Sequence, residues 1–419
     1  MIKHFFVKNF RSIRDRLDIS FVSSSLDDET FFENTFEKGD LSISKVMAFY
    51  GMNASGKSNI AIAFAILREL MVPLFNGPIL PYYPFAFSNE TKNQPTEVGV
   101  EFSLNNDPNS YVYKYFVMFN AERIIEEKFE KMTSQKSSLI YFRKTDEDNK
   151  TMVNIGNNAS NFPLLQALLP SIMPNRTFLS MFNNFNVPDL SDAYNFFTTR
   201  LVNFSFAINS HVDFNPMNIA NNKGLKDFAL KLLKAADFNV DDICVKKSKI
   251  TNYVANQPLF EAERDVLFLE HVGKDNNYEL EFNNESLGTK KIILLAEVLY
   301  PVFNKPSVII IDELEASLHP ELTKLIVTCF LDETINEQNS QLIFTSHETT
   351  LLDLNLLRRD QIVFVYKDHD TNGTYIRSLK DFHVRKTDSV SKSYVSGRYL
   401  TSPEINQNLL GGHYDKIKT

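Results

Sequence analysis

The feature that most constrains this chain is a phosphate-loop pattern at residues 51–58, which read Gly-Met-Asn-Ala-Ser-Gly-Lys-Ser. The pattern follows an apolar, β-prone run (46–50) and precedes a helix-like run (59–70). This strand–loop–helix context is the one that G-x-x-x-x-G-K-S/T requires. Its glycines let backbone N–H groups turn inward around an anion, and the N-terminus of the next helix adds partial positive charge. We therefore expect a phosphate site in which Lys57 reaches phosphate oxygens and the Ser58 hydroxyl ligates Mg²⁺. The alternative is a glycine-rich structural turn.

A second cluster lies far downstream at residues 308–313, which read Val-Ile-Ile-Ile-Asp-Glu. A continuous apolar run of this length is typical of a parallel strand buried on both faces. Acids at its carboxyl end lie where open α/β sheets bind ligands. Asp312 is then placed to hold Mg²⁺, and Glu313 to orient or deprotonate an attacking water. The alternative is a strand end that is acidic by chance.

The spacing of these clusters is informative, because Lys57 and Asp312 lie 255 residues apart, far more than a compact βαβ crossover needs. Three further motifs surround the second cluster. They are Glu-Ser-Leu-Gly-Thr-Lys-Lys at 285–291, Ala-Ser-Leu-His-Pro at 316–320 and Leu-Ile-Phe-Thr-Ser-His-Glu at 342–348.

In this order of motifs the sequence resembles the ABC-type ATPases, specifically the soluble branch with Rad50, SMC and RecF. The resemblance implies a Walker A motif that includes Asn53, Ala54, Ser55, Gly56, Lys57, Ser58 and Asn59, with ATP and Mg²⁺ as ligands. It implies a Walker B pair, Asp312 and Glu313, a D-loop at 317–320 and a switch histidine, His347. It also implies that Ser286, Gly288 and Thr289 form a signature motif that caps the γ-phosphate bound to an opposing subunit.

The signature departs from the usual Leu-Ser-Gly-Gly-Gln, since Leu287 replaces the first glycine and Thr289-Lys290 replaces the last two residues. A serine at a helix start is also a common N-cap, which is the alternative for Ser286. Arg11 contacts nucleotide if it follows its Rad50-like equivalents, and is a solvated turn residue otherwise.

Residues 6–15, 358–362 and 385–399 look like the two ends of the AAA-15/AAA-21 group, which includes RloA-like and abortive-infection ATPases. The middle of the chain matches no motif, and no glutamine lies where the family's Q-loop is expected, near 177–181.

Composition is that of a soluble cytoplasmic enzyme. Of 419 residues, 43% are hydrophobic and 23% charged, which is ordinary for a globular protein. Two cysteines provide neither a disulfide framework nor a metal cluster. The chain shows neither a secretory signal nor an apolar run of 18 residues, so we expect no membrane association. A net charge of −8 does not indicate nucleic-acid binding, although it leaves such binding open.

The expected fold class is α/β: an ABC-ATPase head, in which a mixed sheet carries the phosphate-loop core, with an antiparallel β-subdomain and a short helical insertion arm. Residues 1–160 form an N-terminal lobe with Walker A and a β-meander at 95–145. Residues 161–261 form the helical arm, because 225–238 has helical apolar spacing and no sustained heptads follow. Residues 262–419 form the C-terminal lobe with the signature, Walker B, D-loop and His347.

The resemblance implies an ATPase that forms a homodimer or higher homo-oligomer around ATP. It further implies a sensor or scaffold in bacterial antiphage (abortive-infection) defence, with a separate effector protein such as a TOPRIM-type nuclease or a toxin. The tail after residue 370 is too short for a fused nuclease of that type. A DNA repair or recombination clamp is the alternative, and a transporter subunit fits less well because of the long insert.

Overall fold

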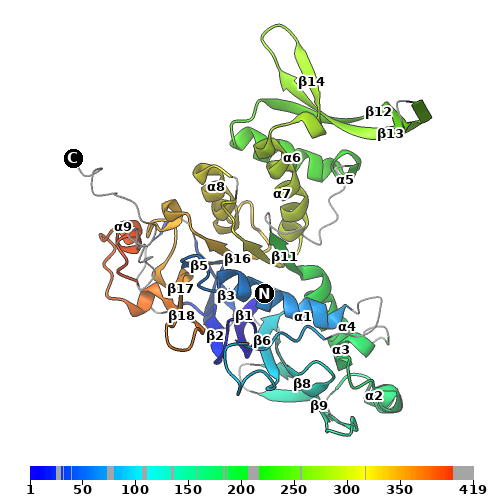
Figure 1. Ribbon diagram of the computed structural model, residues 1–419, viewed down its shortest axis with the longest axis vertical. Coiled ribbons are helices and arrows are strands. Elements are labelled where there is room, and N and C mark those ends of the chain that lie inside the picture. Colours follow the sequence, from blue (N-terminus) through cyan, green and yellow to red (C-terminus); the bar gives the residue numbers. More distant parts are fainter. Residues whose placement is uncertain are drawn as a thin grey trace.

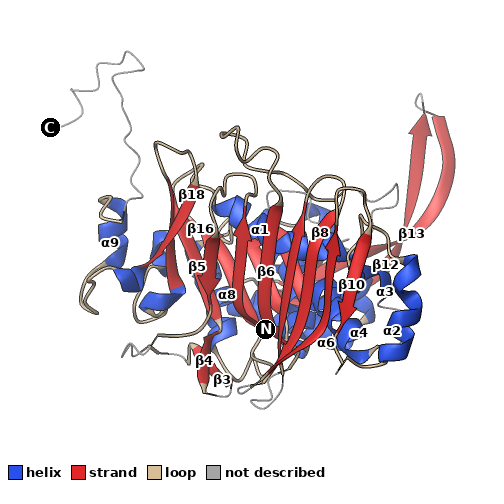
Figure 2. Cartoon of the chain, turned by 90° about the horizontal axis from the view of Figure 1, so that it is seen from below, coloured by secondary structure: helices blue, strands red, loops and turns tan. Residues whose placement is uncertain are grey.

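The structure, a computed structural model, describes residues 1–24, 30–31, 33–38, 40–72, 80–105, 111–133, 136–157, 159–182, 185, 187–205, 217–254, 257–316 and 318–399. Two large sheets enclose α1 (Lys57–Met71), and a three-stranded sheet projects from the far end of the molecule (Figures 1 and 2). The α/β class expected from the sequence is confirmed. Every helix in the described part of the chain is too short or too polar to cross a lipid bilayer.

The central sheet has six strands in the order β11-β15-β16-β5-β17-β18. Neighbours are parallel except for β18, which is antiparallel to β17. The strands are β11 (Leu201–Ser205), β15 (Val308–Asp312), β16 (Gln341–Ser346), β5 (Val46–Gly51), β17 (Ile362–Lys367) and β18 (Thr374–Ser378). All residues of β5, β15 and β16 are buried, which confirms that the run at 308–312 is a central strand.

Alternate side chains of these strands enter two different apolar cores, as the period of a strand dictates. In β15, Val308 and Ile310 pack in the core that contains α1, whereas Ile309 and Ile311 pack in the core with α7 (Leu287–Asn304) and α8 (Pro320–Leu331). Both faces of the sheet are therefore covered. In such sheets, ligands bind at the edge where the carboxyl ends of the parallel strands meet.

The second large sheet is antiparallel, in the order β10-β9-β8-β7-β6-β1-β2, and it is prominent in Figure 2. Its strands are β10 (Thr151–Ile155), β9 (Ser137–Thr145), β8 (Ile124–Met132), β7 (Val112–Phe119), β6 (Thr96–Ser103), β1 (Ile2–Lys8) and β2 (Leu17–Ser20). The β-meander expected at 95–145 is thus confirmed. Phe5 of β1 stacks on Phe64 of α1 with ring centroids 4.0 Å apart, so this sheet packs on the helix that follows the phosphate loop.

The expectation of a helical arm at 161–261 is wrong for much of that segment. Its first part is helical but lies against the α1 core, because Phe178, Phe182, Phe196 and Phe197 are all buried there. The elements between residues 161 and 235 are α2 (Phe162–Leu168), η1 (Leu169–Ser171), α3 (Phe178–Phe182), α4 (Pro188–Asn195), the π-helical turn η2 (Phe196–Arg200), β11, α5 (Met217–Asn221) and α6 (Lys223–Ala235). Of these, α5 and α6 pack in the core that contains α7.

What projects from the body is a β-sheet. It consists of β12 (Val240–Val254), β13 (Gln257–Val272) and β14 (Asn277–Glu281), and it stands clear of both large sheets in Figure 1. We call this sheet the β-projection. At its base Val240, Ile243, Leu267 and Leu269 are buried with residues of α6 and α7. Cross-strand pairing, not helical periodicity, therefore organises residues 240–254 and 257–261.

The remaining elements connect these layers. They are β3 (Thr35–Lys38) and β4 (Leu41–Ser44), which form a small hairpin, together with η3 (Phe282–Asn284), η4 (Thr349–Leu351), η5 (Arg359–Gln361), η6 (Leu379–Asp381) and α9 (Val390–Val395).

Candidate active site

The phosphate loop joins β5 to α1 through left-handed backbone. Gly56, the N-cap of α1, has φ 108°, and Ala54 has φ 63°. A Cβ on Gly56 would lie 2.1 Å from Thr374 Oγ1 and 2.9 Å from Ser12 Oγ, so only glycine fits. This backbone, together with the positive end of α1, is the arrangement that lets N–H groups surround an anion.

Lys57 is the first residue of α1, and its side chain folds back along the loop. Nζ donates to Gly51 O (2.9 Å) and Met52 O (3.0 Å) and lies 2.9 Å from His347 Nε2. Burial lowers the pKa of Lys57 to about 8, despite the nearby carboxylates, of which Glu315 acts most strongly. Burial, and then the charge of Lys57, also lower the pKa of His347. A neutral imidazole that accepts from the lysine is consistent with both shifts.

Asp312 and Glu313 follow the buried strand β15, as expected. Asp312 Oδ1 accepts a hydrogen bond from the Thr345 hydroxyl (2.6 Å), and the same Thr345 oxygen accepts from Glu313 N (2.8 Å). Glu313 has φ 54°, so the chain turns sharply where the strand ends. One threonine on β16 thus orients the Asp312 carboxylate and holds the backbone of Glu313.

These elements surround one cavity of about 540 Å³. It is lined by Arg11, Ser12, Met52, Asn53, Ala54, Gly56, Lys57, Ser58, Asn59, Pro84, Ala86, Phe87, Glu313, His347 and Lys367. The structure therefore brings together most of the residues singled out from the phosphate-loop, Walker B and switch motifs, and it adds a wall from segment 84–87.

Two predicted residues lie just beside this cavity. Asp312 is not among the residues that line the cavity, but Thr345 connects its carboxylate to the backbone of Glu313, which does line it. Ser55 lines a neighbouring cavity of about 490 Å³, and its carbonyl accepts from Thr374 Oγ1 at 2.9 Å.

Arg11 lines the cavity with a left-handed backbone (φ 50°). Its guanidinium lies over the rings of Phe10 and Tyr83, 5.6 and 5.1 Å from their centroids. The side chain is therefore held at the mouth of the cavity by aromatic contacts, although it is exposed.

The signature residues lie elsewhere, at the start of α7 beside the base of the β-projection. Ser286 is the N-cap of α7: its Oγ accepts from Thr289 N (3.1 Å) and lies 2.8 Å from Thr289 Oγ1. Gly288 lies close to the Phe238 ring. None of Ser286, Gly288 and Thr289 lines the phosphate-loop cavity, whereas the neighbouring Leu287 is 71% exposed. The expected D-loop is described only in part, because Ser317 lies outside the described residues.

Sequence reasoning missed several residues that shape the site. Glu315 Oε1 accepts from the backbone N–H of His347 (2.6 Å). Thr374, on the antiparallel edge strand, lies 2.7 Å from the Ser12 hydroxyl, which also accepts from Asn59 Nδ2 (2.7 Å). No local pattern marks these residues, because each acts through a partner far away in sequence. Only the turn position of Glu315, directly after Walker B, could have drawn attention.

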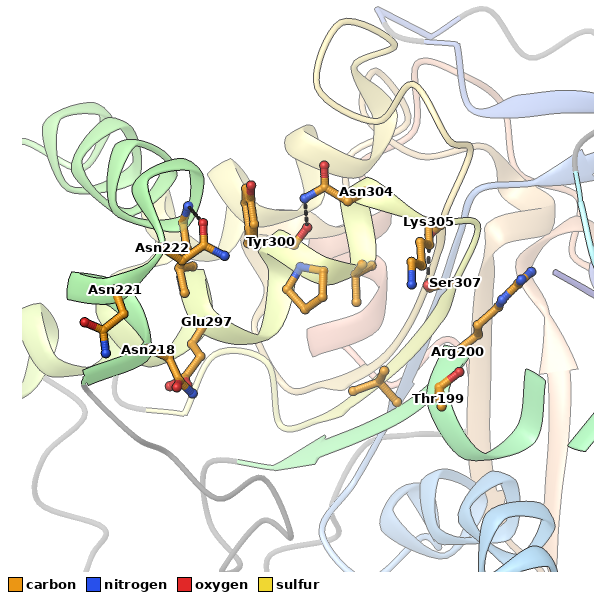
Figure 3. Close-up of a pocket in the computed structure, with 14 residues that line it drawn as sticks. Thr199, Arg200, Asn218, Asn221, Asn222, Glu297, Tyr300, Asn304, Lys305 and Ser307 are labelled. Atoms are coloured by element: carbon orange, nitrogen blue, oxygen red, sulfur yellow. Dashed lines mark hydrogen bonds between the residues drawn. The ribbon is translucent and has the colours of Figure 1, made fainter. Parts of the chain in front are cut away.

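A cavity of about 720 Å³ between η2, β11, α5 and α7 lacks a comparable constellation (Figure 3). Asn218 Nδ2 donates to Glu297 Oε1 (2.6 Å), while Asn304 and Ser307 hydrogen-bond to backbone carbonyls of Tyr300 and Lys305. These polar groups are engaged with one another or with backbone, and they do not converge on a shared point.

Fold and site together define a P-loop ATPase domain of the ABC-like kind. A family model described as "AAA domain, putative AbiEii toxin, Type IV TA system" (AAA_21) matches residues 46–353. The match spans most of the chain and includes the phosphate loop, the signature region and Walker B. The chain belongs to this family.

Comparison with individual proteins adds little to the family match. No curated protein matches the sequence. Among solved structures, one described as "An inward-facing conformation of a putative metal-chelate type ABC transporter" is similar, with 11% identity and a TM-score of 0.23. The similarity covers 44% of this chain and 60% of that protein, and at this level it carries no argument about function.

Proposed function

We propose that this chain binds and hydrolyses ATP with Mg²⁺. The observation that carries the proposal is the convergence of Lys57, Ser58, Glu313 and His347 on one cavity beside the left-handed backbone of the phosphate loop. A lysine and a hydroxyl at a helix N-terminus, with a carboxylate and an imidazole in the same cavity, can bind phosphate oxygens, ligate Mg²⁺ and position or deprotonate a water.

In this proposal each side chain has a distinct task. Lys57 leaves the loop carbonyls and contacts the β- and γ-phosphates through charge-assisted hydrogen bonds. Glu313 accepts a proton from the attacking water, and His347 contacts the γ-phosphate beside the lysine. Mg²⁺ would be held by the Ser58 hydroxyl and by Asp312, and it would neutralise phosphate charge. The residues fit such an ion, because Thr345 occupies Asp312 Oδ1 and Oδ2 takes part in none of the described hydrogen bonds.

The test is Glu313→Gln, which keeps size and polarity but removes the proton acceptor. Hydrolysis should fall by about 10²- to 10⁴-fold, while ATP affinity by calorimetry stays near that of the wild type. Glu321→Gln, an exposed acid at the start of α8, serves as the control and should leave turnover unchanged. Normal hydrolysis by Glu313→Gln would remove this residue from the proposed chemistry.

We further propose that two chains form a head-to-tail dimer that sandwiches two ATP molecules. Support comes from the position of the signature residues: they lie outside the cavity of their own chain, on a surface where Leu287 is exposed. In the dimer, Ser286 of one chain completes the γ-phosphate site of the other.

Complementation between two lesions tests the composite site. Lys57→Ala damages a chain's own phosphate loop, and Ser286→Arg damages the partner's site, so each homodimer has two defective sites. A mixed dimer has one doubly damaged site and one intact site, and it should recover up to about half of wild-type turnover if one site can fire alone. Ser389→Arg, at the exposed N-cap of α9, controls for loss of a serine cap. If Ser286→Arg homodimers hydrolyse ATP normally, Ser286 serves only as an N-cap.

The biological role that we propose is that of an ATPase sensor or scaffold in antiphage defence, working with a separate nuclease or toxin. The family description, which names an abortive-infection-type toxin and a toxin–antitoxin system, supports this role. The test is the plating efficiency of phage on cells that carry the wild-type or the Lys57→Ala protein, with and without a candidate effector (the nuclease or toxin encoded beside this protein). Protection should require both the lysine and the effector. Absence of protection, combined with ATP-dependent, salt-sensitive DNA binding, would favour the repair-clamp alternative instead.

A further inference from the structure

The nucleotide cavity has a wall that none of the phosphate-site motifs supplies. Pro84, Ala86 and Phe87 line it together with the phosphate-loop residues, and Lys367 lies beside Phe87. Phe87 is 68% exposed, which is unusual for a phenylalanine. An exposed ring in the lining of this cavity offers an apolar face to a ligand bound there.

The ring is held in place by its neighbours. The buried Phe85 packs edge-on against Phe87, with centroids 5.8 Å apart and an interplanar angle of 65°. Lys367 Nζ lies 5.5 Å from the Phe87 centroid. Phe85 and Lys367 thus hold the ring in place, and the exposed surface of Phe87 remains available for stacking.

A buried amide, that of Asn9, helps to anchor the loop that carries Phe87. Asn9 Oδ1 accepts from Phe85 N (3.0 Å), and Asn9 Nδ2 donates to Gln94 O (2.7 Å) and Thr91 O (3.0 Å). Asn9 is only 2% exposed. Because the loop is already ordered, little conformational entropy is lost when a ligand stacks on it.

Resting on the proposed function, we propose that Phe87 is the nucleobase platform of the site and that it makes the chain a binder of purine nucleoside triphosphates. With the phosphates at Lys57 and Ser58, the base lies against the wall of 84–87. The side chains of Pro84, Ala86 and Phe87 have no hydrogen-bonding groups, so they contact the face of a base and do not read its edge. The platform favours purines by stacking area and discriminates little between adenine and guanine.

The experiment compares ATP, GTP, UTP and inorganic triphosphate, which lacks a base, by calorimetry. Phe87→Ala should weaken ATP and GTP by about 5- to 150-fold, the range for loss of one stacked base, and leave triphosphate affinity unchanged. Wild-type ATP and GTP affinities should agree within about threefold, and UTP should bind more weakly than either. Phe87→Tyr should restore purine binding, whereas Phe87→Leu, which keeps apolar bulk without a ring, should not.

Tyr278→Ala is the control, because Tyr278 is a 62% exposed aromatic on the remote strand β14. Equal ATP affinity for Phe87→Ala and wild type, with Lys57→Ala defective, would overturn the platform while the phosphate site stands. Equal losses of ATP and triphosphate in Phe87→Ala would also overturn it, since the residue would then act on the phosphates. Absence of both ATP and triphosphate binding in the wild type would overturn the proposed function itself.

Discussion

The phosphate-loop cavity and the β-projection differ in how they are built. The cavity gathers short motifs from the ends of fully buried strands, and its side chains are fixed by hydrogen bonds such as those of Thr345 and Glu315. The β-projection consists of two long strands and a mostly exposed third strand, and the residues that place it in an apolar core lie at its base. The residues suited to ATP chemistry and the sheet that projects outward are thus separate parts of this chain. Substitutions in the cavity should change ATP binding and hydrolysis, whereas substitutions in the β-projection should not.

The sharpest test of this separation is the same substitution in both regions. Lys57→Ala removes two charge-assisted phosphate contacts and should weaken ATP binding on the order of 100-fold. Lys247→Ala, an exposed lysine on β12, should leave ATP affinity unchanged. Calorimetry measures both, and circular dichroism confirms that both variants fold. A comparable loss in the two variants would show that the regions are not independent.

The sequence predicted the cavity far better than the β-projection, and the reason is physical. The phosphate loop is contiguous, and Asp312 and His347 follow apolar runs whose burial is evident from composition alone. Phe87 and Glu315 carry no such signal, since one lies in a loop anchored by Asn9 and the other in a turn. Their roles depend on partners that the sequence does not place beside them.

The error at 161–261 has a related cause. Residues 225–238 do show helical spacing, and α6 forms there. This spacing does not continue through the whole segment, because β11 is an edge strand of the central sheet, paired with β15, and the segment from Val240 pairs with β13. Strand pairing is a long-range property, so local periodicity could not reveal either.

The pKa of Lys57, lowered by burial to about 8, predicts a pH effect confined to the cavity. Bound phosphate favours the charged amine, so the amine must be protonated for tight binding. Below pH 8 it is already charged and affinity should be flat; above pH 8 binding takes up a proton, and affinity should be about tenfold weaker at pH 9 than at pH 7.

Calorimetry at pH 8.5 in buffers of different ionisation enthalpy should detect this proton uptake. Lys57→Arg keeps its charge throughout and should show neither the uptake nor the pH dependence. Affinity of the wild type that stays constant to pH 9.5 would contradict the assignment.

A smaller effect is expected at Glu315, which positions His347 through its backbone N–H. Glu315→Ala removes this hydrogen bond and should lower turnover about tenfold, with ATP affinity little changed. Glu315→Gln retains an acceptor oxygen and should recover most of the turnover. The exposed Glu337→Ala is the control. If Gln and Ala variants are equally impaired, the charge of Glu315 matters, not the hydrogen bond.

The smallest effect should come from shortening the β-projection. Ser248 and Arg264 are paired across β12 and β13, so replacing residues 249–263 with Asn-Gly gives a two-residue hairpin turn in register. The buried base, with Val240, Ile243 and Leu269, remains intact. ATP affinity and basal turnover should therefore stay within about twofold of the wild type, because the residues that line the cavity all belong to other parts of the chain. We expect the loss to appear only in phage protection, where an outward projection would meet a partner.

One contact could break this separation: His271 of β13 lies 2.6 Å from Glu285, the residue before Ser286. If the shortened protein binds ATP normally but hydrolyses it severalfold more slowly, the β-projection acts on the start of α7 through this pair. The two regions are then coupled.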